Sequence, residues 1–387
     1  MRLRRDSPVP LYQQLLKEVR NRIATGEWAV GSRLPNEIEL ATNLGVSRVT
    51  IRQALGAAVD AGLLVRVRGK GTFVSRNGSS EPTHGFVGHV IPFLSHNFNV
   101  RLLLGVESIL KMDQYHLTFS NSEGDIHAEQ RTLQRLEAEG MVGCIVEPAY
   151  GWNPILEDWI ARQYPVVLVD RAPARLPTDL VASDHFSGGY VAVQHLIEQG
   201  YTDIIYLSSQ PMQLSSIVER HEAYRAAMED AGLHPQPPFV ISGARERGFF
   251  TTPAAFVEQE AHAVGQIARW LRGPERPQAI AAMNDLLALL VLAAAERVGL
   301  AIPADLALVG FDDQDFAARC EPPLTTVAQP SFQLGVEAAR LLLQRIRGDI
   351  GPNSHLRLPT ELVVRGSSIH PRPGRPKQSP VQLIHSD

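Results

Sequence analysis

The chain has 387 residues, of which 44% are hydrophobic and 20% are charged, so it can bury a large core without disulfide bonds. Its two cysteines, Cys144 and Cys320, lie far apart and outside any CxxC motif, which argues against a disulfide framework and a zinc site. The longest apolar run, residues 286–295, is too short to span a bilayer, and the first residues show no secretory segment. Composition therefore predicts a cytoplasmic protein of two or three domains without a membrane partner.

The net charge of −4 is spread unevenly along the chain. Residues 1–76 hold 13 Lys and Arg against 6 Asp and Glu, a balance of +7, and the remainder has a balance of −11. A basic first domain joined to an acidic body indicates a polyanionic partner for the first domain alone.

The first 75 residues have the pattern of a small winged domain. Apolar residues of the first segment recur every four residues, and glycines separate the later segments. The predicted elements, in chain order, are helices at 11–23, 37–44 and 47–62, followed by strands at 63–65 and 72–74. This order predicts a winged helix-turn-helix over residues 1–75.

Residues 76–85 are polar and contain Gly, Ser and Pro, which is typical of a linker. From Phe86 onward, short apolar runs alternate with helical stretches, and this alternation predicts an α/β fold with parallel sheets. The predicted strands are 86–93, 116–120, 144–147, 165–170, 204–208, 279–283 and 306–311. The predicted helices are 100–112, 128–139, 188–199, 218–231 and 286–298. Residues 367–387, rich in Pro, Arg and Gln, are predicted to form a flexible tail.

The third predicted helix carries two arginines near its start. Arg48 and Arg52 are four residues apart and share one helix face, and Ser47 and Thr50 lie at the same end. In a helix-turn-helix this end enters the major groove, where arginine matches guanine and hydroxyl groups contact phosphates. The hairpin segment 66–71 adds further positive charge, and its glycines allow close approach of its backbone to DNA. The pattern predicts double-stranded DNA as the partner.

Four motifs of this domain, in order and spacing, resemble the GntR-type winged helix. They are Pro10–Gln14, Leu34–Glu37, Val46–Arg52 and Gly69–Val74. The resemblance implies operator contacts by Ser47, Arg48, Thr50, Arg52, Gly69 and Lys70. One departure is Ile38, which stands where many GntR proteins carry an arginine, so a DNA contact expected there is absent.

Several predicted strands of the body end in polar residues. Glu147, Asp170, the pair 284–285 and the pair 312–313 all follow apolar runs. In parallel α/β sheets, ligands bind beyond the carboxyl ends of the strands. These residues therefore predict a small-molecule site.

The body resembles the LacI/GalR regulators and the periplasmic sugar-binding proteins over residues 86–365. The motifs are Val166–Arg171, Ser183–Asp184, Gly188–Gly189, His195–Leu196, Glu219–Arg220, Ala223–Arg225, Met283–Asp285, Val309–Asp313 and Pro323–Val327. A GntR-type head on such a body resembles the arabinose repressor type. The resemblance implies a periplasmic-binding-protein-like domain over 86–366 with two lobes around an effector cleft. Lobe 1 is expected at about 86–184 and 329–355, and lobe 2 at about 185–328 and 356–366.

The resemblance also implies a set of effector contacts. They are Phe98, Glu147, Asp170, Ser183, Arg220, Asn284, Asp312 and Gln329. A sugar presents hydroxyl groups that both donate and accept, which suits carboxylates, arginine and asparagine. The resemblance favours arabinose or another neutral sugar, with a non-sugar metabolite as the alternative, and a carboxylate at Glu147 would repel acidic ligands. Phe98, Trp152 and Phe250 remain alternatives for the aromatic ring that covers the sugar.

Two other classes of protein fit the sequence less well. An aminotransferase body, found in some GntR proteins, needs a Schiff-base lysine, and beyond the linker the chain has only Lys111 and Lys377. A periplasmic solute-binding protein needs an export signal and lacks a DNA-binding head. We therefore predict a repressor without catalytic residues, cofactor or metal ion. We expect it to act as a homodimer on a palindromic operator and to leave DNA when its effector binds.

Overall fold

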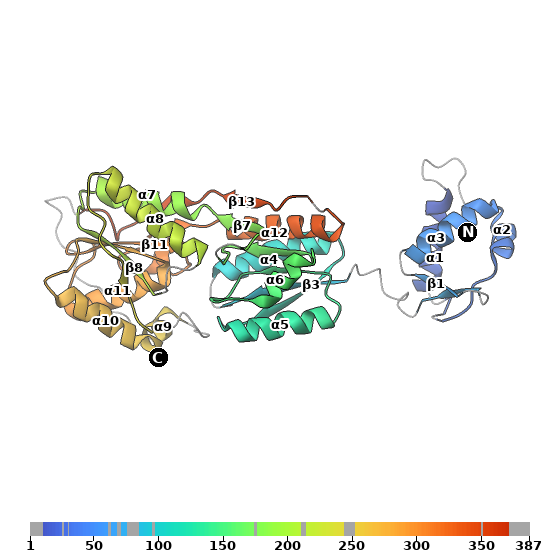
Figure 1. The fold of residues 1–387 in the computed structure, drawn as a ribbon, viewed down its shortest axis with the longest axis horizontal. Coiled ribbons are helices and arrows are strands. Elements are labelled where there is room, and N and C mark those ends of the chain that lie inside the picture. Colours follow the sequence, from blue (N-terminus) through green and yellow to red (C-terminus); the bar gives the residue numbers. More distant parts are fainter. Residues whose placement is uncertain are drawn as a thin grey trace. The chain divides into compact units, whose positions relative to one another are not determined.

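The computed structural model describes residues 11–24, 27–29, 31–60, 63–67, 71–75, 85–94, 97–173, 176–209, 214–243, 252–349 and 351–370. The chain forms two compact units that divide between His84 and Gly85 (Figure 1). Within the described ranges, no helix is both long and apolar enough to cross a membrane.

The N-terminal unit is a helix-turn-helix followed by a two-stranded hairpin. Its elements are α1 (Leu11–Ala24), α2 (Glu37–Leu44), α3 (Arg48–Asp60), β1 (Leu64–Val67) and β2 (Gly71–Val74), and the two strands are antiparallel. The predicted winged helix-turn-helix is confirmed. The apolar faces of these elements share one core, which includes Leu15, Val19, Ile51, Leu55 and Val74.

Local hydrogen bonds fix the start and the end of α2. The Asn36 side chain accepts from the backbone N–H of Glu39, and the Glu39 carboxylate accepts from the backbone N–H of Asn36. Gly45 then adopts a left-handed conformation, with φ of 62°, which ends the helix and turns the chain into α3. The turn therefore sets where α3 begins relative to α2.

Gly56 lies in the middle of α3 with no packing reason for a glycine. No atom lies within 4 Å of the place where a β-carbon would be, and its φ is not left-handed. We expect Gly56→Ala to raise the free energy of unfolding by about 0.5–1 kcal/mol, because alanine restricts the unfolded chain and suits a helix. Equilibrium urea unfolding of the full chain would measure this. Gly105→Ala is the matched control, because its β-carbon would lie 2.1 Å from the Phe332 carbonyl oxygen and must destabilise.

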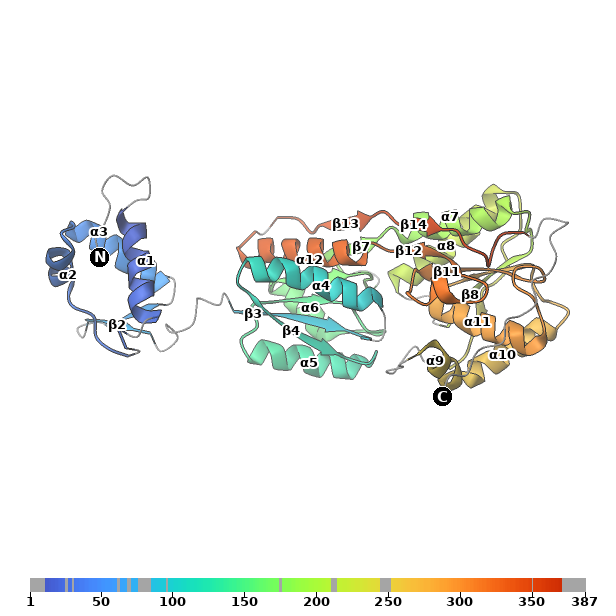
Figure 2. The ribbon, with the colours of Figure 1, turned by 180° about the vertical axis from the view of Figure 1, so that it is seen from behind.

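The second unit has two lobes, each built on a six-stranded and mostly parallel sheet (Figures 1 and 2). The first sheet has the order β13 (His355–Leu358), β7 (Asp179–Ser183), β6 (Val166–Val169), β5 (Gly143–Val146), β3 (Phe86–Ile91), β4 (His116–Asn121). The second has the order β14 (Glu361–Val363), β12 (Thr325–Ala328), β11 (Ala307–Asp312), β10 (Ala279–Ala282), β8 (Ile204–Ser208), β9 (Phe239–Val240). The predicted α/β fold with parallel sheets is confirmed, and β14 pairs antiparallel with β12 at the edge of the second sheet.

Helices cover both faces of each sheet (Figures 1 and 2). In lobe 1, α4 (Asn97–Met112) and α12 (Ser331–Ile346) cover one face, and α5 (Ile126–Ala138) and α6 (Pro154–Ala161) cover the other. In lobe 2, one face carries α7 (His185–Glu198) and α8 (Ser215–Asp230). The other carries α9 (Pro253–Gln259), α10 (Ala261–Arg272) and α11 (Asp285–Val298). A short 3-10 turn, Ala317–Arg319, follows β11.

Helices α4 and α12 cross at very short range. A β-carbon on Gly335 would lie 2.1 Å from the Leu102 carbonyl oxygen, and Gly105 meets the Phe332 carbonyl oxygen in the same way. The two glycines therefore let the helices touch backbone to backbone.

The chain passes between the lobes three times, and one predicted boundary is wrong. The passages follow β7, β12 and β13. Residues 356–358, predicted in lobe 2, belong to β13, which pairs with β7 in the lobe 1 sheet, for example Arg357 with Ala182. Because strand pairing is long-range, the local sequence did not reveal this.

The predicted start of the tail at residue 367 is also wrong. Ser367 and Ser368 are fully buried in lobe 2. The Ser367 hydroxyl donates to the Leu308 carbonyl oxygen at 2.7 Å, and Ser368 Oγ lies 2.8 Å from His195 Nε2. Small polar residues are typical of tails, but here each finds a buried partner, so the body continues past Gly366.

Candidate functional site

The start of α3 presents its polar side chains outward. Ser47 Oγ accepts from the backbone N–H of Thr50 at 3.1 Å and contacts the Thr50 hydroxyl at 2.8 Å, which caps the helix. Ile51 is buried in the core on the opposite face. Arg48 and Arg52 are exposed, as the predicted DNA contacts require. The wing residues Gly69 and Lys70 lie outside the described residues.

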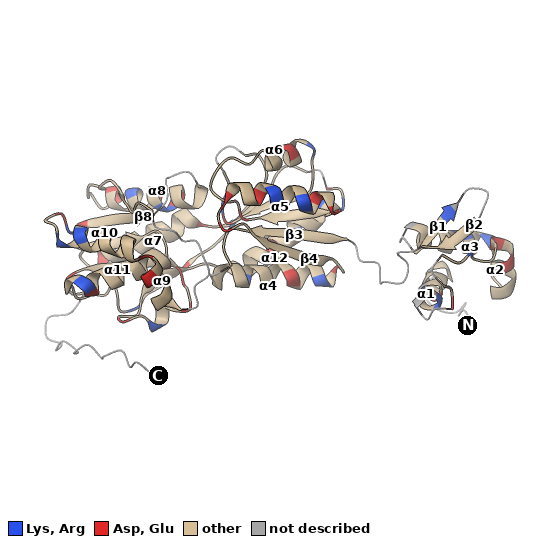
Figure 3. Cartoon of the chain, turned by 90° about the horizontal axis from the view of Figure 1, so that it is seen from below, with Lys and Arg blue, Asp and Glu red and all other residues tan. Residues whose placement is uncertain are grey.

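Glu37 of α2 pairs with one arginine of α3 and with one arginine of β1. Glu37 Oε2 lies 3.3 Å from Arg52 Nη2, and Glu37 Oε1 lies 3.6 Å from Arg66 Nη2. The Arg52 side chain nevertheless stays 65% exposed. Figure 3 shows basic positions on β1 and acidic positions on α2 of this unit. The N-terminal unit therefore offers an exposed guanidinium group that is held in place but still accessible.

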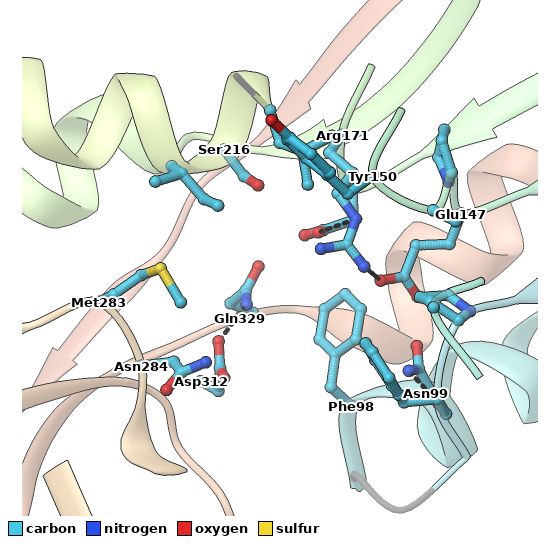
Figure 4. Close-up of a pocket in the computed structure, with 18 of the residues that line it drawn as sticks. Phe98, Asn99, Glu147, Tyr150, Arg171, Ser216, Met283, Asn284, Asp312 and Gln329 are labelled. Carbon is cyan, nitrogen blue, oxygen red and sulfur yellow. Dashed lines mark hydrogen bonds and ion pairs between the residues drawn. The ribbon is translucent and has the colours of Figure 1, made fainter. Parts of the chain in front are cut away.

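The second unit contains a cavity at the carboxyl ends of strands from both sheets (Figure 4). Lobe 1 contributes Glu147, which follows β5, and Asp170, which follows β6. Lobe 2 contributes Asn284, which follows β10, and Asp312, which ends β11. The cavity holds about 950 Å³ of space free of protein atoms, its open mouth included. A cavity lined by residues of two lobes is a common place for a small-molecule ligand.

In lobe 1, Arg171 is paired with the acidic residues of the cavity. Its guanidinium donates to Glu147 Oε1 and lies 4.0 Å from Asp170 Oδ2. Burial raises the pKa of Glu147 to about 7, although Arg171 opposes the shift. Burial also opposes ionisation of Asp170, but the hydrogen bond from His185 and nearby positive charges outweigh it and lower its pKa to about 2. Asp170 is therefore charged at neutral pH, whereas Glu147 changes its protonation state close to neutral pH.

In lobe 2, Arg220 lines the cavity and is only 8% exposed. Its Nη1 donates to the Met283 carbonyl oxygen at 2.8 Å, and Nη2 lies 3.8 Å from Asp312 Oδ1. Its guanidinium carbon stacks 3.7 Å from the centre of the Phe311 ring. Gln329 Nε2 donates to the same Asp312 oxygen at 2.7 Å. The Arg220 guanidinium and the Gln329 amide are thus already engaged by protein acceptors.

Asp170 Oδ1 has only the contact with His185 Nε2 at 3.4 Å, and three further buried oxygen atoms of the cavity wall have no hydrogen-bond partner within the described part of the chain. They are Glu147 Oε2, Gln329 Oε1 and Asn99 Oδ1. A buried acceptor without a hydrogen-bond partner costs folding free energy, and only a donor group can satisfy it. Except where Glu147 is itself protonated, these acceptors therefore suit a ligand that carries several O–H or N–H donors.

Two strand-end aspartates of the cavity have left-handed backbones. Asp170 has φ of 66° and Asp312 has φ of 116°, and Asp313 follows with φ of 49°. Such conformations strain a residue that has a β-carbon, and they cluster where the surrounding structure aims a side chain. Here they accompany two carboxylates of the cavity wall.

Seven of the eight predicted effector contacts line the cavity, namely Phe98, Glu147, Asp170, Arg220, Asn284, Asp312 and Gln329. Ser183 ends β7 fully buried and is not among the lining residues. Its role as an effector contact stays a prediction. Of the aromatic alternatives, Phe98 lines the cavity and Trp152 is 66% exposed elsewhere, whereas Phe250 lies outside the described residues.

Comparison with known proteins supports both units. Residues 11–74 match the bacterial regulatory proteins of the gntR family, and residues 193–368 match the periplasmic binding protein-like domain. An arabinose metabolism transcriptional repressor of Geobacillus stearothermophilus is 30% identical over 94% of this chain and 99% of its own. The chain belongs to the GntR/LacI-type transcriptional repressors.

Further relatives share the body of this repressor. A ribose operon repressor of Escherichia coli is 32% identical over 73% of this chain and 82% of its own. A LacI family transcriptional regulator from Enterococcus faecalis, solved with bound ribose, has 26% identity and a TM-score of 0.61. It covers 74% of this chain and 100% of its own. Two of these relatives are named as repressors, and residues 11–74 of this chain match the gntR family, so this chain is a DNA-binding regulator and not an enzyme.

Sequence analysis of the repressor missed several residues of its cavity. They are Asn99, Tyr150, Arg171, Ser216, Met283 and Gln314. Arg171 had a signal, because it directly follows Asp170 at a strand end. Asn284 has two roles, since its side-chain oxygen also caps α11 by accepting from the Leu287 N–H at 2.9 Å.

The raised pKa of Glu147 makes the stability of the repressor depend on pH. Because Glu147 ionises less readily when folded, its stabilising contribution is full below about pH 4.5 and is lost as pH rises through about 7. Between these pH values the wild type should lose up to roughly 3 kcal/mol of unfolding free energy through Glu147, and Glu147→Gln should abolish this loss. Thermal unfolding of both proteins between these pH values would measure the difference. Glu139→Gln, at a 57% exposed side chain, is the control and should leave the pH slope unchanged.

Proposed function

We propose that this protein represses transcription by binding an operator through α3 and the hairpin, and that a neutral sugar in the cavity controls that binding. The proposed DNA contacts are Ser47, Arg48, Thr50, Arg52, Gly69 and Lys70. The proposed effector contacts are Phe98, Glu147, Asp170, Arg171, Arg220, Asn284, Asp312 and Gln329. The observation that carries the effector proposal is the group of three unpartnered buried acceptors in one cavity.

Charge supports a neutral ligand rather than an anion. Glu147, Asp170 and Asp312 face the cavity with Arg171 and Arg220, and the arginines already pair with these carboxylates. A phosphate or carboxylate ligand would meet three carboxylates whose arginine partners are already paired, and it would be repelled. A polyol supplies a hydroxyl donor to each acceptor and an apolar ring face to Phe98.

The names of the relatives favour a pentose. One relative is named for arabinose metabolism, another for the ribose operon, and one solved neighbour holds ribose. We propose arabinose or another neutral pentose as the effector. We further propose that its binding lowers operator affinity by favouring one arrangement of the two lobes.

Thermal unfolding against a panel of sugars tests this proposal. The panel contains arabinose, ribose and other neutral sugars, with phosphosugars and purines as controls. A ligand at 100 times its Kd stabilises by about 2.7 kcal/mol, which moves the transition by a few degrees. A shift confined to neutral sugars supports the proposal. Shifts from phosphosugars or purines alone overturn the sugar assignment while leaving the DNA-binding regulator in place.

We also propose that the repressor binds DNA as a homodimer, because a two-fold protein matches a palindromic operator. Sedimentation of the full chain, alone and with selected operator DNA, tests this. Two chains on each duplex support the proposal, and one chain on each duplex contradicts it.

A further inference from the structure

The outward face of α3 carries an exposed apolar side chain in the middle of its polar residues. Val49 is 73% exposed, the highest value among the large hydrophobic side chains described in the N-terminal unit. Arg52, Gln53 and Gly56 follow it at spacings of three, four and seven, so they share its helix face. Arg52 and Gln53 are exposed, and Gly56 has open space where a side chain would be.

Neither the fold nor the helix cap explains a valine at this position. The core face of α3 consists of Ile51, Ala54, Leu55 and Ala58, all at most 3% exposed. The cap is made by Ser47 with Thr50. Valine is a weaker helix former than most polar residues, and exposure to water brings no hydrophobic stabilisation.

We propose that Val49 contacts the C5 methyl group of a thymine in the major groove, beside the base that Arg52 contacts. This inference rests on the proposed operator binding through α3. The major groove displays the thymine methyl, and an apolar contact with it distinguishes thymine from the other bases. Valine suits this contact because its β-branch allows few rotamers and fixes the direction of its methyl groups.

The geometry of the neighbouring residues supports a defined position for Val49. The Ser47 cap fixes the first turn of α3, and Glu37 holds Arg52 one turn further along the same face. Gly56, further along this face, presents no side chain to keep the helix away from the DNA. The operator should therefore contain a thymine at a fixed step from a guanine in each half-site.

Exchange of thymine for deoxyuridine tests the inference, because it removes only the C5 methyl group. Operator sites are first selected from random duplex DNA with the full chain. Each selected thymine is then replaced singly by deoxyuridine, and affinity is measured by fluorescence anisotropy at fixed salt. We expect one thymine per half-site at which the loss of the methyl group weakens binding roughly fourfold, the value for one buried methyl group. The wild type should also prefer 5-methylcytosine to cytosine at that position.

Two substitutions complete the test. Val49→Ala should bind the thymine and deoxyuridine operators equally at that position, whereas Val100→Ala, at a 40% exposed valine of α4, should keep the difference. The inference is overturned if the wild type discriminates at no thymine, or if Val49→Ala still discriminates. If operator selection succeeds, either of these two results leaves the proposed function unaffected. Failure to select any DNA sequence would instead overturn the proposed function itself.

Discussion

Arg220→Ala should abolish the response of the repressor to its effector while leaving operator affinity unchanged. Arg220 is buried, faces Asp312 at 3.8 Å and stacks on Phe311 at 3.7 Å. Its removal leaves the carboxylates of the cavity with a single arginine, and an uncompensated buried charge costs about 3–5 kcal/mol. We therefore expect effector affinity to fall at least about 100-fold.

The measurement is operator release, followed by anisotropy, as sugar concentration rises. Arg225→Ala is the matched control: it lies on the same helix, is 55% exposed and pairs with Glu229, so it should respond like the wild type. Arg220→Lys keeps the charge but loses the planar fork, and we expect an intermediate response. If Arg220→Ala released operator at the wild-type sugar concentration, the cavity would not be the effector site.

Arg52→Ala should weaken binding to the selected operator by about 1–3 kcal/mol and should reduce discrimination against other DNA. The guanidinium is 65% exposed and is held by Glu37, so its loss removes a contact with DNA and little folding energy. We expect urea unfolding of the variant to match the wild type within about 0.5 kcal/mol.

Lys17→Ala is the control for charge alone. Lys17 is an exposed cation on α1 of the same unit. Its loss should weaken binding to all DNA by a similar factor and lower the salt dependence without changing sequence preference. An Arg52→Ala protein that loses operator and random DNA affinity equally would show that Arg52 contacts phosphates and not bases.

The sequence reveals the parts of this fold that depend on local chemistry. Helix α3 follows from its apolar period, and its start follows from Ser47. Glu147, Asp170 and Asp312 are found because each ends a short apolar strand, and parallel strands end at one edge. These are properties of a residue and its near neighbours.

The features that were missed depend on distant partners. Strand β13 exists because His355–Leu358 pairs with β7, more than 170 residues earlier, and its exposed, mixed sequence gives no strand signal. Ser183 and Arg171 both lie at strand ends, yet Ser183 is fully buried, whereas Arg171 lines the cavity. Only the packing around each residue decides between them.

The contact between α4 and α12 couples the movements of these two helices. α4 begins at the cavity with Phe98 and Asn99, and α12 begins just after Gln329. Each runs for 16 residues, roughly 24 Å, away from that end. Because Gly105 and Gly335 bring the backbones into contact, neither helix can rotate or slide without the other. A displacement of one helix at the cavity should therefore move the other helix with it, and a β-carbon at either glycine would force the two backbones apart.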